Sequence, residues 1–350
     1  MNTIAINTAS ESSKKIGIWL LICALTVYLM IIVGGATRLT QSGLSMVEWE
    51  PIMGTIPPLS LTDWQDTFNK YQQSPEYLKI NKGMSLEEFK SIFWWEYGHR
   101  VLGRFIGMLF FIPFVFFLIR GYLSRPWKFK LFGLFLLGGV QAVVGWYMVK
   151  SGLVNDPHVS QYRLASHFGI ALLIYIVMIW FMLDFFKSQQ RRSSSISLKT
   201  TSLLVTKLVF FMMITGAFVA GLKAGHIYNT FPQMGDSFVP QGLFSITPAW
   251  KNLFENPATV QFIHRCTAYI IVLSVVILFL KGLKTDRLYP ELKIKSYLIA
   301  VLILMFLQVS IGITTLVNKV PVLWGVLHQF TGVALLTSLI FLTHKLSRDY

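Results

Sequence analysis

Eight long apolar runs decide what this chain can fold into. A helix that crosses a bilayer needs about 20 mostly apolar residues, and the runs that meet this requirement are 17–37, 97–119, 130–149, 163–185, 203–222, 260–280, 296–316 and 323–343. Of the 350 residues, 54% are hydrophobic and only 13% are charged, whereas soluble domains carry roughly a quarter charged residues. The sequence therefore predicts an all-α integral membrane protein whose eight transmembrane helices are solvated by a lipid bilayer.

The net charge of +15 gives an orientation and does not indicate a nucleic-acid partner. More than half of the 31 Lys and Arg residues lie at the two termini and in the short connections after the second, fourth and sixth runs. The other side carries most of the acidic residues. Because cytoplasmic loops are enriched in Lys and Arg, both termini are predicted to be cytoplasmic.

Two connections on the outer side are long, about 38–96 and 223–259. In the first, Trp64, Phe68 and Tyr71 follow one another at helical spacing. Ser85 and Glu88 fit a capping box, which predicts that another short helix opens there. This connection is long enough to cover a pocket, although it could also be a solvated cap.

The two halves of the chain repeat one pattern of polar residues within apolar runs. The matched residues are His99-Arg100 with His264-Arg265, Gln141 and Gly145 with Gln308 and Gly312, and His167 with His328. Four spans per half give both halves the same orientation, as in a parallel repeat. The sequence therefore predicts two tandem four-helix bundles, within 1–190 and 200–350, related by a pseudo-twofold axis along the membrane normal.

The repeated histidines are candidate metal ligands. His99 and His167 in the first half, like His264 and His328 in the second, start spans that enter from the outer side, so each pair lies at similar depth. Two histidines are too few for a tetrahedral zinc site, and no carboxylate and histidine set forms a non-haem iron triad in both halves. Two facing imidazoles and an apolar slot are what haem iron requires. Hydrogen-bonded packing histidines are the alternative.

The two arginines that follow the first histidine of each half are candidate contacts for haem carboxylates. A guanidinium group at Arg100 or Arg265 suits paired recognition of a propionate. The alternative is that each side chain simply extends from a helix end toward the membrane surface.

The halves differ in the residue three positions before that histidine, which is Glu96 in the first half and Gln261 in the second. This spacing places each residue on the same helix face as the histidine. Glu96 could act as a proton acceptor beside haem, or it could pair with Arg100 and only orient it. The difference predicts chemistry on a bound tetrapyrrole in the first half and a permanent, electron-passing haem in the second.

Together these residues resemble the haem A synthase family. The matching stretches are 34–46, 94–100, 141–153, 161–167, 228–235, 261–265 and 328–332. They begin with Gly-Gly-Ala-Thr-Arg and include Trp-Trp-Glu-Tyr-Gly-His-Arg and His-Gln-Phe-Thr-Gly. The first outer connection has no cysteine pair, which resembles the subclass of Gram-negative bacteria and mitochondria.

The resemblance implies an activity and assigns roles to the repeated residues. Haem O would enter the first half, where His99 and His167 hold it next to Arg100 and Glu96 is the acid–base or charge-stabilising group. Two successive hydroxylations of its C8 methyl group, followed by loss of water, would give the formyl group of haem A. His264 and His328 would ligate the iron of a haem b cofactor.

The resemblance also implies a location and partners. The first 16 residues do not read as a transit sequence or a cleavable signal, so a bacterial inner membrane is the expected location. A haem O synthase, which is a farnesyltransferase, would supply the substrate, and an electron-transfer partner of unknown identity would complete the reaction. The product would pass to cytochrome oxidase assembly.

Two other functions fit parts of the pattern. A di-haem b-type membrane electron carrier would contain two permanent and chemically identical haems. A transporter built from repeats would explain the duplication without the paired histidines, and it would be colourless.

Overall fold

A computed structural model describes residues 2–48, 53–154, 157–186 and 196–347. Within these ranges the chain is helical, and extended pairing is limited to one isolated bridge between Met234 and Ser237. Eight helices are long and apolar enough to cross a membrane. The predicted fold class is thereby confirmed, and the chain is a multi-pass membrane protein.

The long helices match the eight predicted runs. They are α1 (Asn2–Leu39), α4 (Leu86–Ile119), α5 (Arg125–Gly152), α6 (Gln161–Phe185), α7 (Ile196–Gly221), α9 (Pro257–Leu288), α10 (Lys295–Val317) and α11 (Val322–Ser347). Helix α7 ends one residue before its predicted run does.

The start of α4 corrects one prediction. The capping box is present, because the Ser85 hydroxyl accepts from the Glu88 N–H and the Glu88 carboxylate accepts from the Ser85 N–H. The helix that it opens is not a separate short one, since it runs on without a break into the second span. Gly98 is the only weak helix former before His99, and one glycine costs a helix only about 1 kcal/mol.

The described chain divides into two compact units. One comprises residues 26–171, and the other comprises residues 1–25 together with 172–350. We call them the first and the second unit. The division near residues 190–200 that the sequence repeat suggests stays a prediction.

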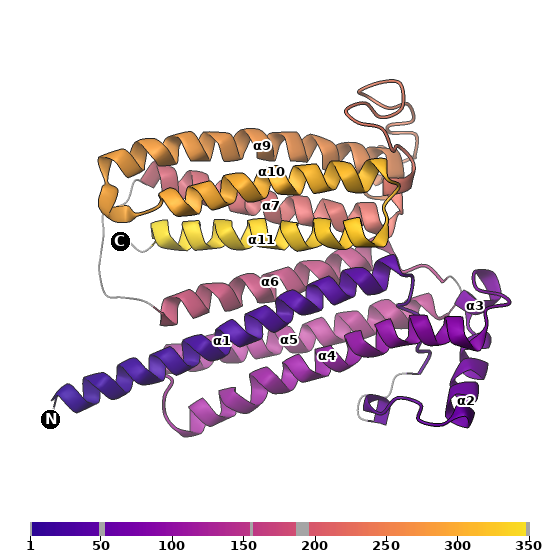
Figure 1. The fold of residues 1–350 in the computed structure, drawn as a ribbon, viewed down its shortest axis with the longest axis horizontal. Coiled ribbons are helices and arrows are strands. Elements are labelled where there is room, and N and C mark those ends of the chain that lie inside the picture. The colour runs from indigo at the N-terminus through magenta and orange to yellow at the C-terminus, as the bar shows by residue number, and fades with distance from the viewer. Residues whose placement is uncertain (1, 49–52, 155–156, 187–195, 348–350) are drawn as a thin grey trace. The chain divides into compact units, whose positions relative to one another are not determined.

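The second unit contains a four-helix bundle. Helix α7 contacts α9, α9 contacts α10, α10 contacts α11, and α11 contacts α7 again, so the four helices close into a ring (Figure 1). The core of this ring is apolar, with Leu336, Leu339 and Val333 of α11 fully buried. Small residues allow close approach, since Leu298 of α10 packs directly on Gly282 of α9.

The second unit also contains the other long connection, residues 222–256. Its short elements are η2 (Ala224–His226), η3 (Ala249–Lys251) and α8 (Asn252–Glu255), and η4 (Pro290–Leu292) precedes α10. Asn256 caps α9 by accepting from the N–H groups of Ala258 and Thr259. This cap fixes where the helix that carries His264 begins.

The first unit is built around α4, which contacts α5. Residues 26–39 of α1 and 161–171 of α6 complete it. Met30 of α1 packs on Gly103 of α4. Leu44, which follows α1, packs on Gly152 at the end of α5, so the chain after α1 folds back over the ends of these helices.

The connection between α1 and α4 forms a folded cap, which contains η1 (Met53–Thr55), α2 (Leu61–Gln72) and α3 (Pro75–Lys79). The predicted helical spacing is confirmed, because Trp64, Phe68 and Tyr71 are buried on one face of α2. They pack against Phe89 and Phe93 in the first turns of α4. The cap therefore has an aromatic core of its own, which fastens it to α4.

Glu76 of α3 is buried within this cap, with 5% of its surface exposed. The Tyr71 hydroxyl donates to Glu76 Oε2 at 3.2 Å, and Asn81 donates to the Tyr71 hydroxyl at 2.7 Å. Burial, together with the negative charge of Glu96, raises the pKa of Glu76 to about 7, although Arg38 partly opposes the shift. The cap thus contains a carboxyl group that titrates near neutral pH.

The stability of the cap should fall as the pH rises from about 4.5 to about 7 and should level off above that. An unfolded Glu76 would ionise near 4.5, so above that pH folding must keep this carboxyl group neutral or bury its charge. Glu76→Gln removes the penalty and should stabilise the cap at pH 8 by at most about 3 kcal/mol, with little effect at pH 4.5. Hydrogen–deuterium exchange of residues 61–79, corrected for intrinsic rates, measures this, and Asp66→Asn on the exposed face of α2 is the control. Equal protection of wild type and Glu76→Gln at pH 8 would contradict it.

Candidate functional site

Each histidine of the first unit packs against a glycine of a neighbouring helix. His99 of α4 faces Gly34 of α1, where its Nε2 lies 3.2 Å from the position that a Cβ would occupy. His167 of α6 faces Gly145 of α5, with its Cε1 2.7 Å from the Cβ position. Since real Cβ contacts below 3.0 Å essentially do not occur, glycine at 145 is what lets the His167 ring lie there.

The second unit repeats this arrangement. His264 of α9 packs against Gly216 of α7, with Cε1 3.3 Å from the Cβ position, and His328 of α11 packs against Gly312 of α10, with Cε1 2.7 Å away. The sequence repeat therefore has a structural counterpart, because in both units two histidines from different helices each lie on a glycine.

Both histidines of each predicted pair lie in one unit, His99 with His167 in the first and His264 with His328 in the second. The Nδ1 atom of His264 is hydrogen-bonded to the Thr215 hydroxyl at 2.8 Å, which leaves Nε2 available to a metal. That the two histidines of a pair share one metal atom stays a prediction.

The other ring nitrogens fit a ligand role. The Nδ1 atoms of His167 and His328 are buried and have no hydrogen-bond partner among the described residues. Gln141, one of the repeated glutamines, has its Nε2 3.3 Å from His167 Nε2. Buried polar atoms normally have a hydrogen-bond partner. A buried histidine with an unpaired ring nitrogen is therefore unusual as a packing residue.

The donor set suits haem better than a bare metal ion. The described residues contain no group of three or more His, Cys, Asp or Glu side chains that could surround an ion. Two neutral imidazoles on facing helices, with glycines that clear space beside the rings, are the donors that a haem iron with two axial histidines requires. The residues present could therefore hold one such group in each unit.

Glu96 is 2% exposed and is bound on both oxygens. Its Oε2 accepts from the Ser45 hydroxyl and from the Met46 N–H, each at 2.8 Å. Its Oε1 accepts from Arg100 Nε at 3.0 Å and from Arg100 Nη2 at 2.6 Å. The pairing with Arg100 that the sequence left open is therefore present, and the loop after α1 adds two further donors.

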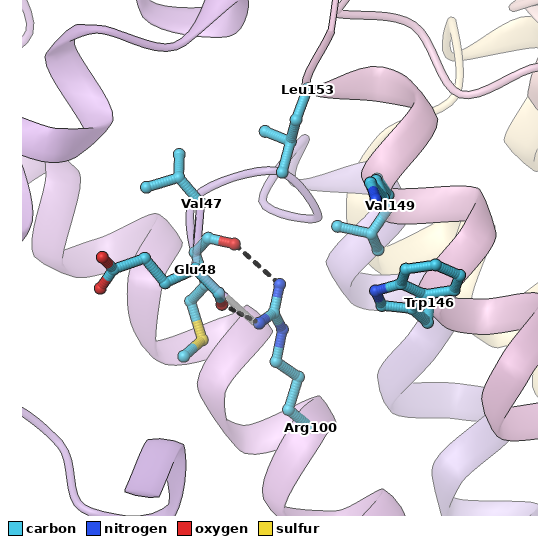
Figure 2. Close-up of a pocket in the computed structure, with 8 residues that line it drawn as sticks. Val47, Glu48, Arg100, Trp146, Val149 and Leu153 are labelled. Carbon is cyan, nitrogen blue, oxygen red and sulfur yellow. Dashed lines mark hydrogen bonds between the residues drawn. The ribbon is translucent and has the colours of Figure 1, made fainter. Parts of the chain in front are cut away.

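Arg100 also holds that loop in place. It donates to the carbonyl oxygens of Met46 at 2.8 Å and of Glu48 at 2.9 Å (Figure 2). Its guanidinium group is thus shared between Glu96 and the backbone. The position of the loop depends on a charged group one residue from His99.

The second unit has the same framework with the hydrogen bonds reversed. Gln261 Nε2 donates to the Tyr228 carbonyl at 3.0 Å, whereas Glu96 can only accept. Arg265 donates to the carbonyls of Tyr228, Thr230 and Gln233 at 2.9 to 3.0 Å. Its Nε is buried with no hydrogen-bond partner among the described residues. The second unit therefore places a neutral amide where the first places a carboxylate.

A cavity of about 200 Å³ opens in the first unit beside Arg100 (Figure 2). It is lined by Met46, Val47, Glu48, Arg100, Trp146, Val149, Lys150 and Leu153. Of these residues, only Arg100 is a candidate site residue from the sequence alone.

The comparisons with known proteins identify the family. The COX15-CtaA family of cytochrome oxidase assembly proteins matches residues 17–340. The chain belongs to this family. The match begins in α1 and ends in α11, so it takes in all eight long helices of a COX15-CtaA protein, and it confirms the resemblance found in the sequence. The subclass without a cysteine pair stays a prediction.

Relatives within the COX15-CtaA family match along almost their whole length. The chain is 48% identical over 339 residues to the haem A synthase of Nitrosospira multiformis, a match that covers 96% of this chain and 94% of the relative. It is 44% identical over 342 residues to the haem A synthase of Nitrosomonas eutropha, covering 97% and 95%. It is 43% identical over 344 residues to that of Parvibaculum lavamentivorans, covering 98% of each.

Gly312→Ala should displace the His328 ring and lower the haem content of the purified protein several-fold. The added methyl group would lie 2.7 Å from Cε1, so the imidazole must move. Gly139→Ala is the matched control, because nothing lies within 4 Å of its Cβ position and alanine favours a helix. The ratio of haem to protein, from the visible spectrum, is the measurement. A wild-type ratio and spectrum in Gly312→Ala would show that the glycine does not position this histidine.

Proposed function

We propose that the chain is a haem A synthase, an oxidoreductase that converts haem O to haem A. The observation that carries the proposal is the match to haem A synthases over 96% of the chain. The paired histidines of both units support it, because they offer one haem-binding arrangement for a substrate and one for a cofactor.

The first unit is the proposed substrate site. His99 and His167 hold haem O, and Glu96 lies one helical turn from His99 with its charge fixed by Arg100. The reaction oxidises the C8 methyl group by two successive hydroxylations, and loss of water from the resulting diol gives the formyl group. Glu96 Oε2, which the Ser45 hydroxyl and the Met46 N–H hold in place, is the atom at which a proton released in these steps would be held.

The second unit is the proposed cofactor site. His264 and His328 would hold the iron of a haem b, which would supply electron transfer, and Thr215 orients the first of them through Nδ1. An iron with both axial positions filled by histidine is suited to electron transfer. The buried Arg265 Nε, which lacks a partner among the described residues, is the proposed contact for a propionate group.

The proposed location is a bacterial inner membrane, with both termini in the cytoplasm because the basic connections lie on that side. A haem O synthase would supply the substrate to the first unit. Electrons removed from the substrate would pass through the second unit to a partner protein or a small carrier.

The alternative, a di-haem electron carrier, requires two equivalent permanent haems. The contrast between Glu96 and Gln261 argues against it, because the hydrogen bonds beside the first histidine run in opposite directions in the two units. A carrier has no evident need for a buried carboxylate in one unit alone.

Pigment extraction from wild type and Glu96→Gln tests the proposed function. The wild-type protein should yield haem B together with haem O or haem A. Glu96→Gln should retain haem B and haem O, because neither pair of histidines is altered, whereas haem A should fall by about a hundredfold or more.

Glu87→Gln is the control for this experiment, since Glu87 is an exposed carboxylate on the same helix that pairs with Lys90. Full haem A output from Glu96→Gln would remove Glu96 from the mechanism. Haem B as the sole pigment of the wild-type protein would favour the electron carrier.

A further inference from the structure

The structure assigns to Lys150 the binding of a carboxylate group of the haem substrate, in the cavity that adjoins the first histidine pair. This inference rests on the proposed function. It concerns how the substrate is oriented, a role for which the sequence offered Arg100, which already forms an ion pair with Glu96.

Neither histidine of the first unit lines the cavity, but a residue next to each histidine site does. Arg100, in its wall, directly follows His99 on α4. Trp146, also in its wall, directly follows Gly145, on which the His167 ring rests. A tetrapyrrole held between the two imidazoles would therefore bring one edge of its ring close to this cavity.

Arg100, in the cavity wall, already has a counter-ion. Its guanidinium group forms an ion pair with Glu96 and donates to two loop carbonyls. Glu48, the acidic residue of the lining, forms an ion pair with Lys70 at 2.9 Å. Arg100 and Glu48 therefore both have a counter-ion already.

Lys150 differs from both. It forms no ion pair with a carboxylate of the described chain, and its ammonium group lies 4.9 Å from the centre of the Trp146 ring. A cation over an aromatic face is held in place while its donors stay available. Figure 2 shows Trp146, Val149 and Leu153 around the same opening, and Lys150 also lines it, so the cation borders an apolar wall.

An apolar wall bordered by a cation matches the edge of a haem. The macrocycle is apolar and carries its two carboxylates on one edge. A lysine ammonium group is a flexible point charge that pairs well with a carboxylate. An anionic lipid headgroup offers similar chemistry, so the test must separate these two sources.

The test compares the affinity of the purified holoprotein for haem O with its affinity for the dimethyl ester of haem O, in wild type and in Lys150→Gln. Haem O should bind about tenfold more weakly to Lys150→Gln, as expected when a charge-assisted contact is lost. The ester should bind wild type more weakly than haem O does, and the substitution should weaken its binding no further. Lys150→Arg should restore most of the affinity for haem O.

Lys130→Gln is the matched control. Lys130 lies 4.5 Å from the ring of Trp127 at the other end of α5, so it is the same kind of contact on the same helix, remote from the cavity. Its substitution should leave both affinities unchanged. Retained haem B in every variant shows that the second unit is still folded and loaded.

Four results would overturn the inference. Lys150→Gln could bind haem O as wild type does, or it could lose affinity for acid and ester alike, which would indicate a structural or lipid-binding lysine. Equal binding of acid and ester by the unaltered wild type would exclude the carboxylate contact even if the variants failed to fold. A wild type that binds neither compound would instead overturn the proposed function, and the inference with it.

Discussion

The proposed haem sites depend on the contact between each imidazole and a glycine of the neighbouring helix. A histidine on an apolar helix can point in several directions, and these contacts fix the direction of all four rings. Where the approach is closest, at Gly145 and Gly312, a methyl group would overlap Cε1 of the histidine. Because each unit uses two such contacts, the rings of a pair are directed by the backbone of the bundle, and the space beside them is set by close packing. This is the kind of preorganisation that a large rigid ligand such as haem requires.

On this duplicated framework, one substitution separates the two units. A carboxylate at position 96 can only accept hydrogen bonds, so the loop after α1 offers it a hydroxyl and an N–H, and an arginine balances its charge. An amide at position 261 donates instead to the Tyr228 carbonyl. Both arrangements hold an outer connection against the helix that bears the first histidine, but only one of them places a negative charge beside the ligand site. The proposed division between a reacting haem and a resident haem follows from that difference.

Much of the fold could be predicted from the sequence because the signals are periodic. The apolar runs gave the eight helices, the offset between His99 and His264 gave the repeat, and Ser85 with Glu88 located a helix start. The predicted extent of α4 was wrong, since a capping box marks where a helix begins and not where it ends. Gly34, Thr215 and Lys150 could not be recognised, because their roles arise from contacts between helices that are distant in sequence. Glu76 was hidden for the same reason, as its surroundings come from the cap, α1 and α4 together.

The most direct test of the central claim is electron paramagnetic resonance of the oxidised, purified protein, in wild type and with His264→Ala or His328→Ala. If two imidazoles share one iron, the wild-type spectrum contains a low-spin ferric signal with the g-values of bis-histidine haem. Either substitution should remove the contribution of haem B to that signal, through loss of haem B or conversion to a high-spin form, and leave only the contribution of haem held in the first unit. An unchanged low-spin signal and unchanged haem B content in both variants would contradict ligation by this pair, and with it the proposed use of the second unit.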